Sequence, residues 1–137
     1  MTSVGIGRRA SRDLGVEVVV WDGDIDDAEI TAFLVGLAAD PQWPAGRLNL
    51  TDMRTAGGIA ELDRDLVSDL IEGLANIRIA VVAPSGSAGA VQFGEFAAPY
   101  GTELSVHAGV ESACAWLEID ARVARSMLEA IRAELGA

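Results

Sequence analysis

The run Arg47-Leu48-Asn49-Leu50-Thr51-Asp52-Met53-Arg54 lies near the middle of the chain, and the other predicted elements are arranged around it. It alternates apolar and polar residues, follows the turn Pro44-Ala45-Gly46 and leads into Gly57-Gly58, which is typical of a β-strand between two turns. We expect its carboxyl end to place Asp52, Arg54 and Thr55 at an edge of the sheet, just before a helix. Ligands and partners of open α/β sheets bind at that edge.

Apolar and β-branched runs predict the other strands. Val16–Trp21 is a β-branched run, and Leu104–His107 alternates apolar and polar residues. Ile77–Ala83 is apolar on both faces over most of its length, as in a central strand covered by helices on both sides. Residues 4–8 form either an edge strand or an open segment. Helical patterns lie at 26–40, 62–74, 91–96, 110–117 and 121–135. This alternation predicts an α/β fold with a single-layer, mostly parallel or mixed sheet of four or five strands, flanked by helices.

Composition narrows the function. The 137 residues predict one domain, and 21 acidic against 10 basic side chains disfavour nucleic acid or an anionic membrane as a partner. All ten basic residues are arginine, which excludes chemistry that needs a lysine. A single cysteine, no signal-peptide pattern and no apolar run of about 18 residues predict a cytoplasmic protein without a membrane span.

Three segments between Val16 and Leu117 have a familiar order: Gly23-Asp24-Ile25-Asp26 after the first strand, Leu48–Arg54, and Leu104–His107 with the following Glu111-Ser112-Ala113 and Trp116-Leu117. In this order of elements the chain resembles the STAS family, in particular its SpoIIAA-like branch of small stand-alone bacterial domains. The three segments are similar to the first strand and helix start, the central strand ending in an aspartate, and the last strand with its closing helix. The resemblance implies a closed core over about residues 16–117, with 121–136 as an extra C-terminal helix.

The resemblance also implies a function that works through protein partners. In founding members, a partner kinase phosphorylates a hydroxyl residue after the central strand, which switches binding to an anti-sigma factor. The matching segment here, Arg54-Thr55-Ala56-Gly57-Gly58, lacks the Asp-Ser-(Ser/Thr)-Gly pattern, and Thr55 is its only hydroxyl residue. We therefore expect Thr55 not to be phosphorylated. Other relatives are similar in fold to lipid-binding SEC14-like domains, so a carrier or sensor of a small apolar or lipid-like ligand is the alternative.

Two groups of polar residues are candidates for partner or ligand binding. Asp52 and Arg54 lie on the same side of an alternating strand, close to Thr55. They either form a binding edge or have a structural role, as a local ion pair or a cap for the next helix, and we favour the structural role. Ser85 and Ser87 lie in a Ser/Gly loop before a helix, where free backbone N–H groups could bind an anion. Turn formation explains the same serines, and we favour it.

Candidates for catalysis are few. His107 is the only histidine, and a catalytic triad would need serine and acid partners from other loops. One histidine and one cysteine, Cys114, exclude a zinc site, and Cys114 fits a small core position. We therefore expect no catalytic residue, no metal and no cofactor in a protein that is not an enzyme.

Apolar residues give two further expectations. A pocket between sheet and helices would be lined by Trp43, Phe93, Phe96 and Trp116, with core packing as the alternative. A deep cavity there would favour the carrier, and a solid core would favour the protein-interaction domain. The C-terminal helix either covers its own sheet or meets a second copy, and we favour a homodimer through the stripe Val123, Met127, Leu128, Ile131 and Leu135.

Overall fold

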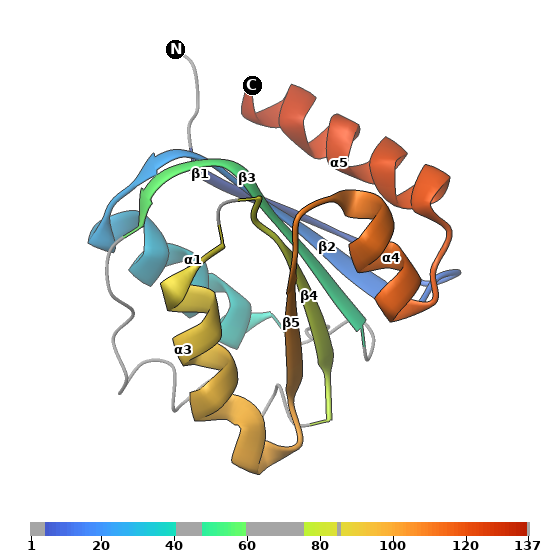
Figure 1. The fold of residues 1–137 in the computed structure, drawn as a ribbon. Coiled ribbons are helices and arrows are strands. Elements are labelled where there is room, and N and C mark those ends of the chain that lie inside the picture. Colours follow the sequence, from blue (N-terminus) through green and yellow to red (C-terminus); the bar gives the residue numbers. More distant parts are fainter. Residues whose placement is uncertain (1–4, 41–47, 60–75, 85, 137) are drawn as a thin grey trace.

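Five strands form one mixed sheet in the computed structural model, which describes residues 5–40, 48–59, 76–84 and 86–136 (Figure 1). The strand β1 is antiparallel to β2, and the strands from β2 to β5 run parallel to one another. In order across the sheet they are β1 (Gly5–Ser11), β2 (Val16–Ile25), β3 (Leu48–Ile59), β4 (Arg78–Val82) and β5 (Glu103–His107). The predicted α/β sheet is confirmed, and residues 4–8 fall largely within the edge strand β1.

Helices cover both faces of this sheet (Figure 1). The helices α1 and α3 lie on one face, and α4 and α5 lie on the other. Their bounds are α1 (Asp27–Ala39), α3 (Ala88–Ala97), followed by the short 3-10 helix η2 (Ala98–Tyr100), α4 (Val110–Leu117) and α5 (Ala121–Leu135). The helix predicted over 62–74 lies outside the described residues, as do Trp43 and Ser85.

The strand β4 is buried from both sides, as its apolar sequence predicts. Ala80 and Val82 pack with the core of α4 and α5, whereas Ile79 and Val81 pack with Phe93 of α3. Each of these strand residues is buried. Successive side chains of a strand point to opposite faces, so a run of consecutive apolar residues such as Ile79–Val82 needs cover on both faces.

A side-chain cap marks the start of α1. The backbone N–H of Glu29 donates to Asp26 Oδ1 at 2.8 Å, which satisfies one of the free donors of the first turn. Ile25 and Ile30, before and inside the helix, are both buried. A polar cap with buried apolar residues on either side of it is typical of a helix N-terminus.

The C-terminal helix α5 packs on its own sheet. Leu128 and Ile131 are each 1% exposed, and Leu135 is 9% exposed, in contact with β1 and β2. The approach is close, because a Cβ atom on Gly7 of β1 would lie 2.6 Å from Ile131 Cγ2. The expectation that Leu128, Ile131 and Leu135 contact a second copy is therefore wrong. Of the same stripe, Val123 is exposed and Met127 is partly buried.

The strand β3 is longer than its sequence indicates. It continues through Gly57-Gly58 to Ile59 and pairs with β2 as far as Ile25. Asp52 therefore lies inside β3 rather than at its carboxyl end, which corrects the prediction. Its partner in β4 is Val82, the last residue of that strand. Asp52 thus lies at the level where β4 ends, and β2 and β3 extend beyond it.

Candidate functional site

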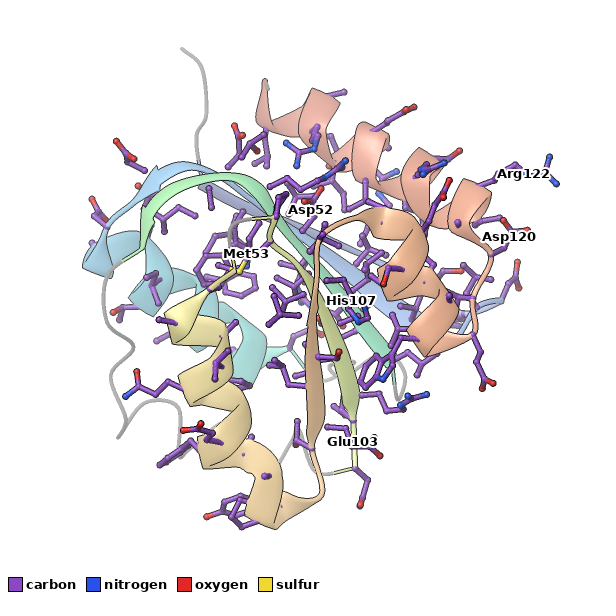
Figure 2. The ribbon with its side chains drawn as sticks, in the orientation of Figure 1. Asp52, Met53, Glu103, His107, Asp120 and Arg122 are labelled. Atoms are coloured by element: carbon purple, nitrogen blue, oxygen red, sulfur yellow. The ribbon has the colours of Figure 1, made fainter. Side chains whose placement is uncertain are left out.

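Asp52 is a fully buried charged residue in β3, the middle strand of the sheet. Its neighbour Met53 packs in the core beneath α3, so Asp52 points to the opposite face, towards α5 (Figure 2). Arg54 donates to the Asp52 carboxylate three times: from Nε to Oδ1 at 2.9 Å, from Nη2 to Oδ2 at 2.8 Å and from its backbone N–H to Oδ1 at 3.0 Å. Of the two structural roles predicted for Asp52 and Arg54, the structure shows the local ion pair.

A second arginine reaches Asp52 from α5. Arg132 Nη2 donates to Asp52 Oδ2 at 2.7 Å, and Arg132 Nη1 donates to Thr55 Oγ1 at 2.6 Å. Thr55 Oγ1 in turn donates to Asp22 Oδ1 at 2.6 Å, and Arg132 Nη1 lies 3.7 Å from the same Asp22 oxygen. We call Asp22, Asp52, Arg54, Thr55 and Arg132 the Asp52 cluster. It joins β2, β3 and α5.

The electrostatics of the Asp52 cluster favour ionised groups. Burial raises the pKa of Asp52, but hydrogen bonds from Arg54 and Arg132 outweigh it and hold that pKa below its ordinary value. The hydrogen bond to Asp52 raises the pKa of Arg54. Two carboxylates and two guanidinium groups leave the cluster formally neutral. The ion pairs of Arg132 with Asp52 and Asp22 therefore connect α5 to the sheet. The sequence did not predict that Asp22 and Arg132 belong to this cluster.

The remaining polar candidates have local roles in the structure. Ser87 Oγ accepts from the backbone N–H of Ala90 at 3.2 Å, so this serine caps α3. Cys114 is buried in the core, as expected, and burial raises the pKa of its thiol. The described residues hold no group of three or more side chains suited to a metal ion. None of the described helices is long and apolar enough to cross a membrane.

His107 has a serine partner that sequence spacing did not reveal. Its Nδ1 atom lies 2.7 Å from Ser112 Oγ, and its ring packs at 5.9 Å from the Trp116 ring. The other ring nitrogen, Nε2, is buried and has no hydrogen-bond partner in the described part of the chain. A catalytic serine needs a histidine that is oriented by a third group, and His107 lacks one among these residues.

Two of the aromatic candidates, Phe93 and Trp116, do not line one interior space. Phe93 packs on the face of β4 that α3 covers, whereas Trp116 packs against the core on the opposite face. The expectation that these residues line one pocket between sheet and helices is therefore wrong for Phe93 and Trp116. Phe96 lies partly buried on α3. The Arg78 guanidinium carbon lies 4.1 Å from the centre of the Trp116 ring, which places a cation over this aromatic face.

An open hollow follows the outer edge of β5. Its volume is about 700 Å³. The lining consists of Val91, Gly94, Glu95 and Ala98 from the side of α3, residues 102–106 at the strand, and Trp116 from α4. We call this hollow the β5 groove. Several lining residues are exposed, Val91 to 49%, so the groove opens at the rim of the sheet rather than between sheet and helices.

Comparison with solved structures supports the topology. The chain is similar to the crystal structure of an uncharacterized protein from the DUF3478 family of Shewanella loihica PV-4, described as having a SpoIIAA-like fold. The TM-score is 0.53 at 14% identity, over 85% of this chain and 95% of that one. The chain has a SpoIIAA-like fold. No protein-family model and no curated protein matches the sequence. The similarity therefore supports the SpoIIAA-like fold, and function has to be argued from the site.

Proposed function

We propose that this SpoIIAA-like domain is a regulatory protein-interaction module that acts by binding a partner protein and has no enzymatic activity. The observation that best supports the proposal is that the open hollow, the β5 groove, lies at the edge of the sheet and not in its interior. Both faces of the sheet carry packed cores, one around Leu50 and one around Val81, and the β5 groove lies outside them. A module that binds macromolecules needs an accessible surface, whereas a carrier needs an enclosed apolar space.

The chemistry of the polar residues also supports a binding role. The Asp52 carboxylate is surrounded by donors from Arg54 and Arg132, which leaves it poorly placed as a general base. His107 and Ser112 are paired, but no third group orients the ring in the described part of the chain. Partner binding requires neither a nucleophile nor a metal.

The test begins with proteins captured on the immobilised domain from a lysate of its own organism. Each captured protein is purified separately and titrated into the domain by calorimetry. We expect at least one to form a stoichiometric complex with a dissociation constant of about 1 μM or tighter. Failure of every purified candidate to bind would contradict the proposal.

The second candidate function is a carrier of a small apolar ligand. The volume of the β5 groove lies within the range of about 300–1,000 Å³ that small-molecule sites occupy, and Trp116 and Leu104 give it apolar walls. Native mass spectrometry of the purified protein separates the two functions. We expect the mass of the chain alone. A lipid or other apolar molecule retained at one per chain would favour the carrier.

A further inference from the structure

The outer side of β5 carries backbone groups that no strand satisfies in the described part of the chain. Glu103 N–H donates to Ile77 at 3.0 Å, and the His107 carbonyl accepts from Ala83 N–H at 2.9 Å, so both residues turn their backbone towards β4. In a parallel ladder, alternate residues turn their N–H and C=O groups to opposite sides of the strand. Leu104 and Val106 therefore point these groups into the β5 groove. Because β5 is the last strand of the sheet, that side is a free edge.

The two walls of the groove differ in character: the wall towards α3 is apolar, and the wall towards α4 carries a carboxylate and an aromatic ring. On the side of α3, Leu104 and Val106 pack beside the helix, and Gly94 brings the helix close, since an added Cβ would lie 3.0 Å from Leu104 Cβ. On the side of α4, the Glu103 side chain and the Trp116 ring line the groove. A strand laid along this edge would place alternate side chains against these two walls.

The charged side chains that line the described part of the groove are acidic. The charged residues that line it are Glu95 and Glu103, and the whole chain carries a formal net charge of −11. Glu103 lies 3.8 Å from Arg78 and keeps 67% of its side chain exposed, so this ion pair is loose and the carboxylate is accessible. A cationic side chain beside Glu103 would also lie near the Trp116 ring, over which the Arg78 guanidinium already lies.

We propose that the β5 groove binds an extended, basic segment of the partner protein, which adds to the sheet as a further strand beside β5. The proposal rests on the proposed function and names its partner chemistry. Backbone groups of the segment pair with Leu104 and Val106, its arginine or lysine side chains face Glu103 and Trp116, and its apolar side chains face α3. Strand addition supplies affinity through the main chain and specificity through alternate side chains.

A second copy of this chain does not fit the same edge. Two β5 edges related by a twofold axis would bring two acidic grooves together, and like charges oppose such pairing. An anionic lipid surface is disfavoured by the same carboxylates, Glu95 and Glu103. A basic peptide strand satisfies both the free backbone groups and the charge.

The probe is a synthetic peptide of about eight residues with alternating arginine and valine and blocked ends, titrated into the full chain. One control peptide carries N-methyl groups on alternate backbone nitrogens, which prevents strand pairing but keeps the charge. A second control replaces each arginine with glutamate. We expect the first peptide to bind and both controls to bind at least about tenfold more weakly.

Two protein variants with equal charge locate the binding site. The double substitution E95K/E103K alters the groove, and E118K/E129K alters exposed acids outside it. We expect the groove variant to weaken binding of the arginine–valine peptide about tenfold relative to the matched control. Amide hydrogen exchange gives an independent readout, because paired Leu104 and Val106 amides should exchange about tenfold more slowly when the peptide is bound.

Equal binding by the N-methylated peptide, equal loss in the two variants, or protection at other amides would overturn strand addition. So would no binding of the arginine–valine peptide. Loss of strand addition alone leaves the proposed function standing when a purified partner still forms a stoichiometric complex, and that complex would then survive E95K/E103K. Failure of both experiments would remove both proposals.

Discussion

Arg132 in α5 donates a 2.7 Å hydrogen bond to Asp52 in β3, across 80 positions of the chain. The Asp52 side chain is fully buried, and the Arg132 side chain is 18% exposed. A buried ion pair gains little over a well-packed apolar pair, but removal of one partner leaves an uncompensated charge. The packing of α5 on the sheet therefore depends on the ionisation of the Asp52 carboxylate in β3.

Replacement of Arg132 with methionine should loosen α5. The substitution keeps an unbranched apolar stem but removes the donors to Asp52 and Thr55. Since Arg54 still donates to the Asp52 carboxylate, we expect the free energy of unfolding to fall by about 2 kcal/mol. Urea denaturation followed by circular dichroism measures the change. The control R122M, at an exposed position of the same helix, should stay within about 0.5 kcal/mol of the parent; equal losses in both variants would refute the role of Arg132.

The pKa of Asp52 predicts a pH-dependent contribution to stability. Since that pKa lies below its ordinary value of 3.8 in the folded state, the ionised carboxylate stabilises the fold at pH values above 3.8. The contribution disappears as the pH falls through the folded-state pKa. In the variant D52N the free energy of unfolding should be lower than in the parent near pH 7, and the gap should close in acid. A gap that stays constant from pH 7 to about pH 2 would contradict this assignment.

The close approach of Gly7 to α5 gives a steric prediction. A Cβ atom at Gly7 would lie 2.6 Å from Ile131 Cγ2, so G7A should force strand and helix apart and lower the free energy of unfolding by about 1–3 kcal/mol. Gly36, inside α1, has no atom within 4 Å of its added Cβ. G36A should therefore stabilise by about 0.5–1 kcal/mol through helix propensity. Thermal denaturation of both variants should show shifts of opposite sign, and a stabilised G7A would refute the close packing.

Local patterns in the sequence were sufficient to predict structural features that depend on neighbouring residues. Alternation along one strand brought Asp52 and Arg54 to the same side, and the apolar run from Ile79 to Val82 predicted the burial of β4. The Asp26 cap of α1 was also readable, because its partner Glu29 lies three residues away. In each of these cases, the interaction or the pattern lies within a few residues of the chain.

Features that depend on packing between distant segments could not be predicted from the sequence. Gly57-Gly58 is a common turn signal, yet pairing with β2 holds it within β3. Arg132 borders the apolar stripe next to Ile131, but nothing in that position indicates Asp52 as its partner. The stripe of α5 showed that one face is buried without showing which surface covers it. Phe93 and Trp116 likewise lie on opposite faces, which sequence spacing does not specify.

Thr55 is expected to remain unmodified by an anti-sigma kinase. Its hydroxyl group donates to Asp22 and accepts from Arg132. A phosphate there would remove the donor to Asp22 and add negative charge beside that carboxylate. Incubation of the folded protein with such a kinase and ATP, followed by mass spectrometry, should find no added phosphate. The variant T55A serves as the blank for background modification. Stoichiometric phosphate on Thr55 of the parent alone would restore a phosphorylation switch.

Charge introduced along the α5 stripe should affect folding according to burial. Ile131 is 1% exposed and packs against the sheet, whereas Val123 on the same helix is 42% exposed. A glutamate at a buried apolar position has no donor to compensate it, so I131E should unfold the domain or lower its free energy of unfolding by more than about 4 kcal/mol. V123E should remain folded, with a change within about 0.5 kcal/mol. Circular dichroism and urea denaturation of the two variants measure this difference, and a folded, stable I131E protein would show that α5 is not part of the core of its own chain.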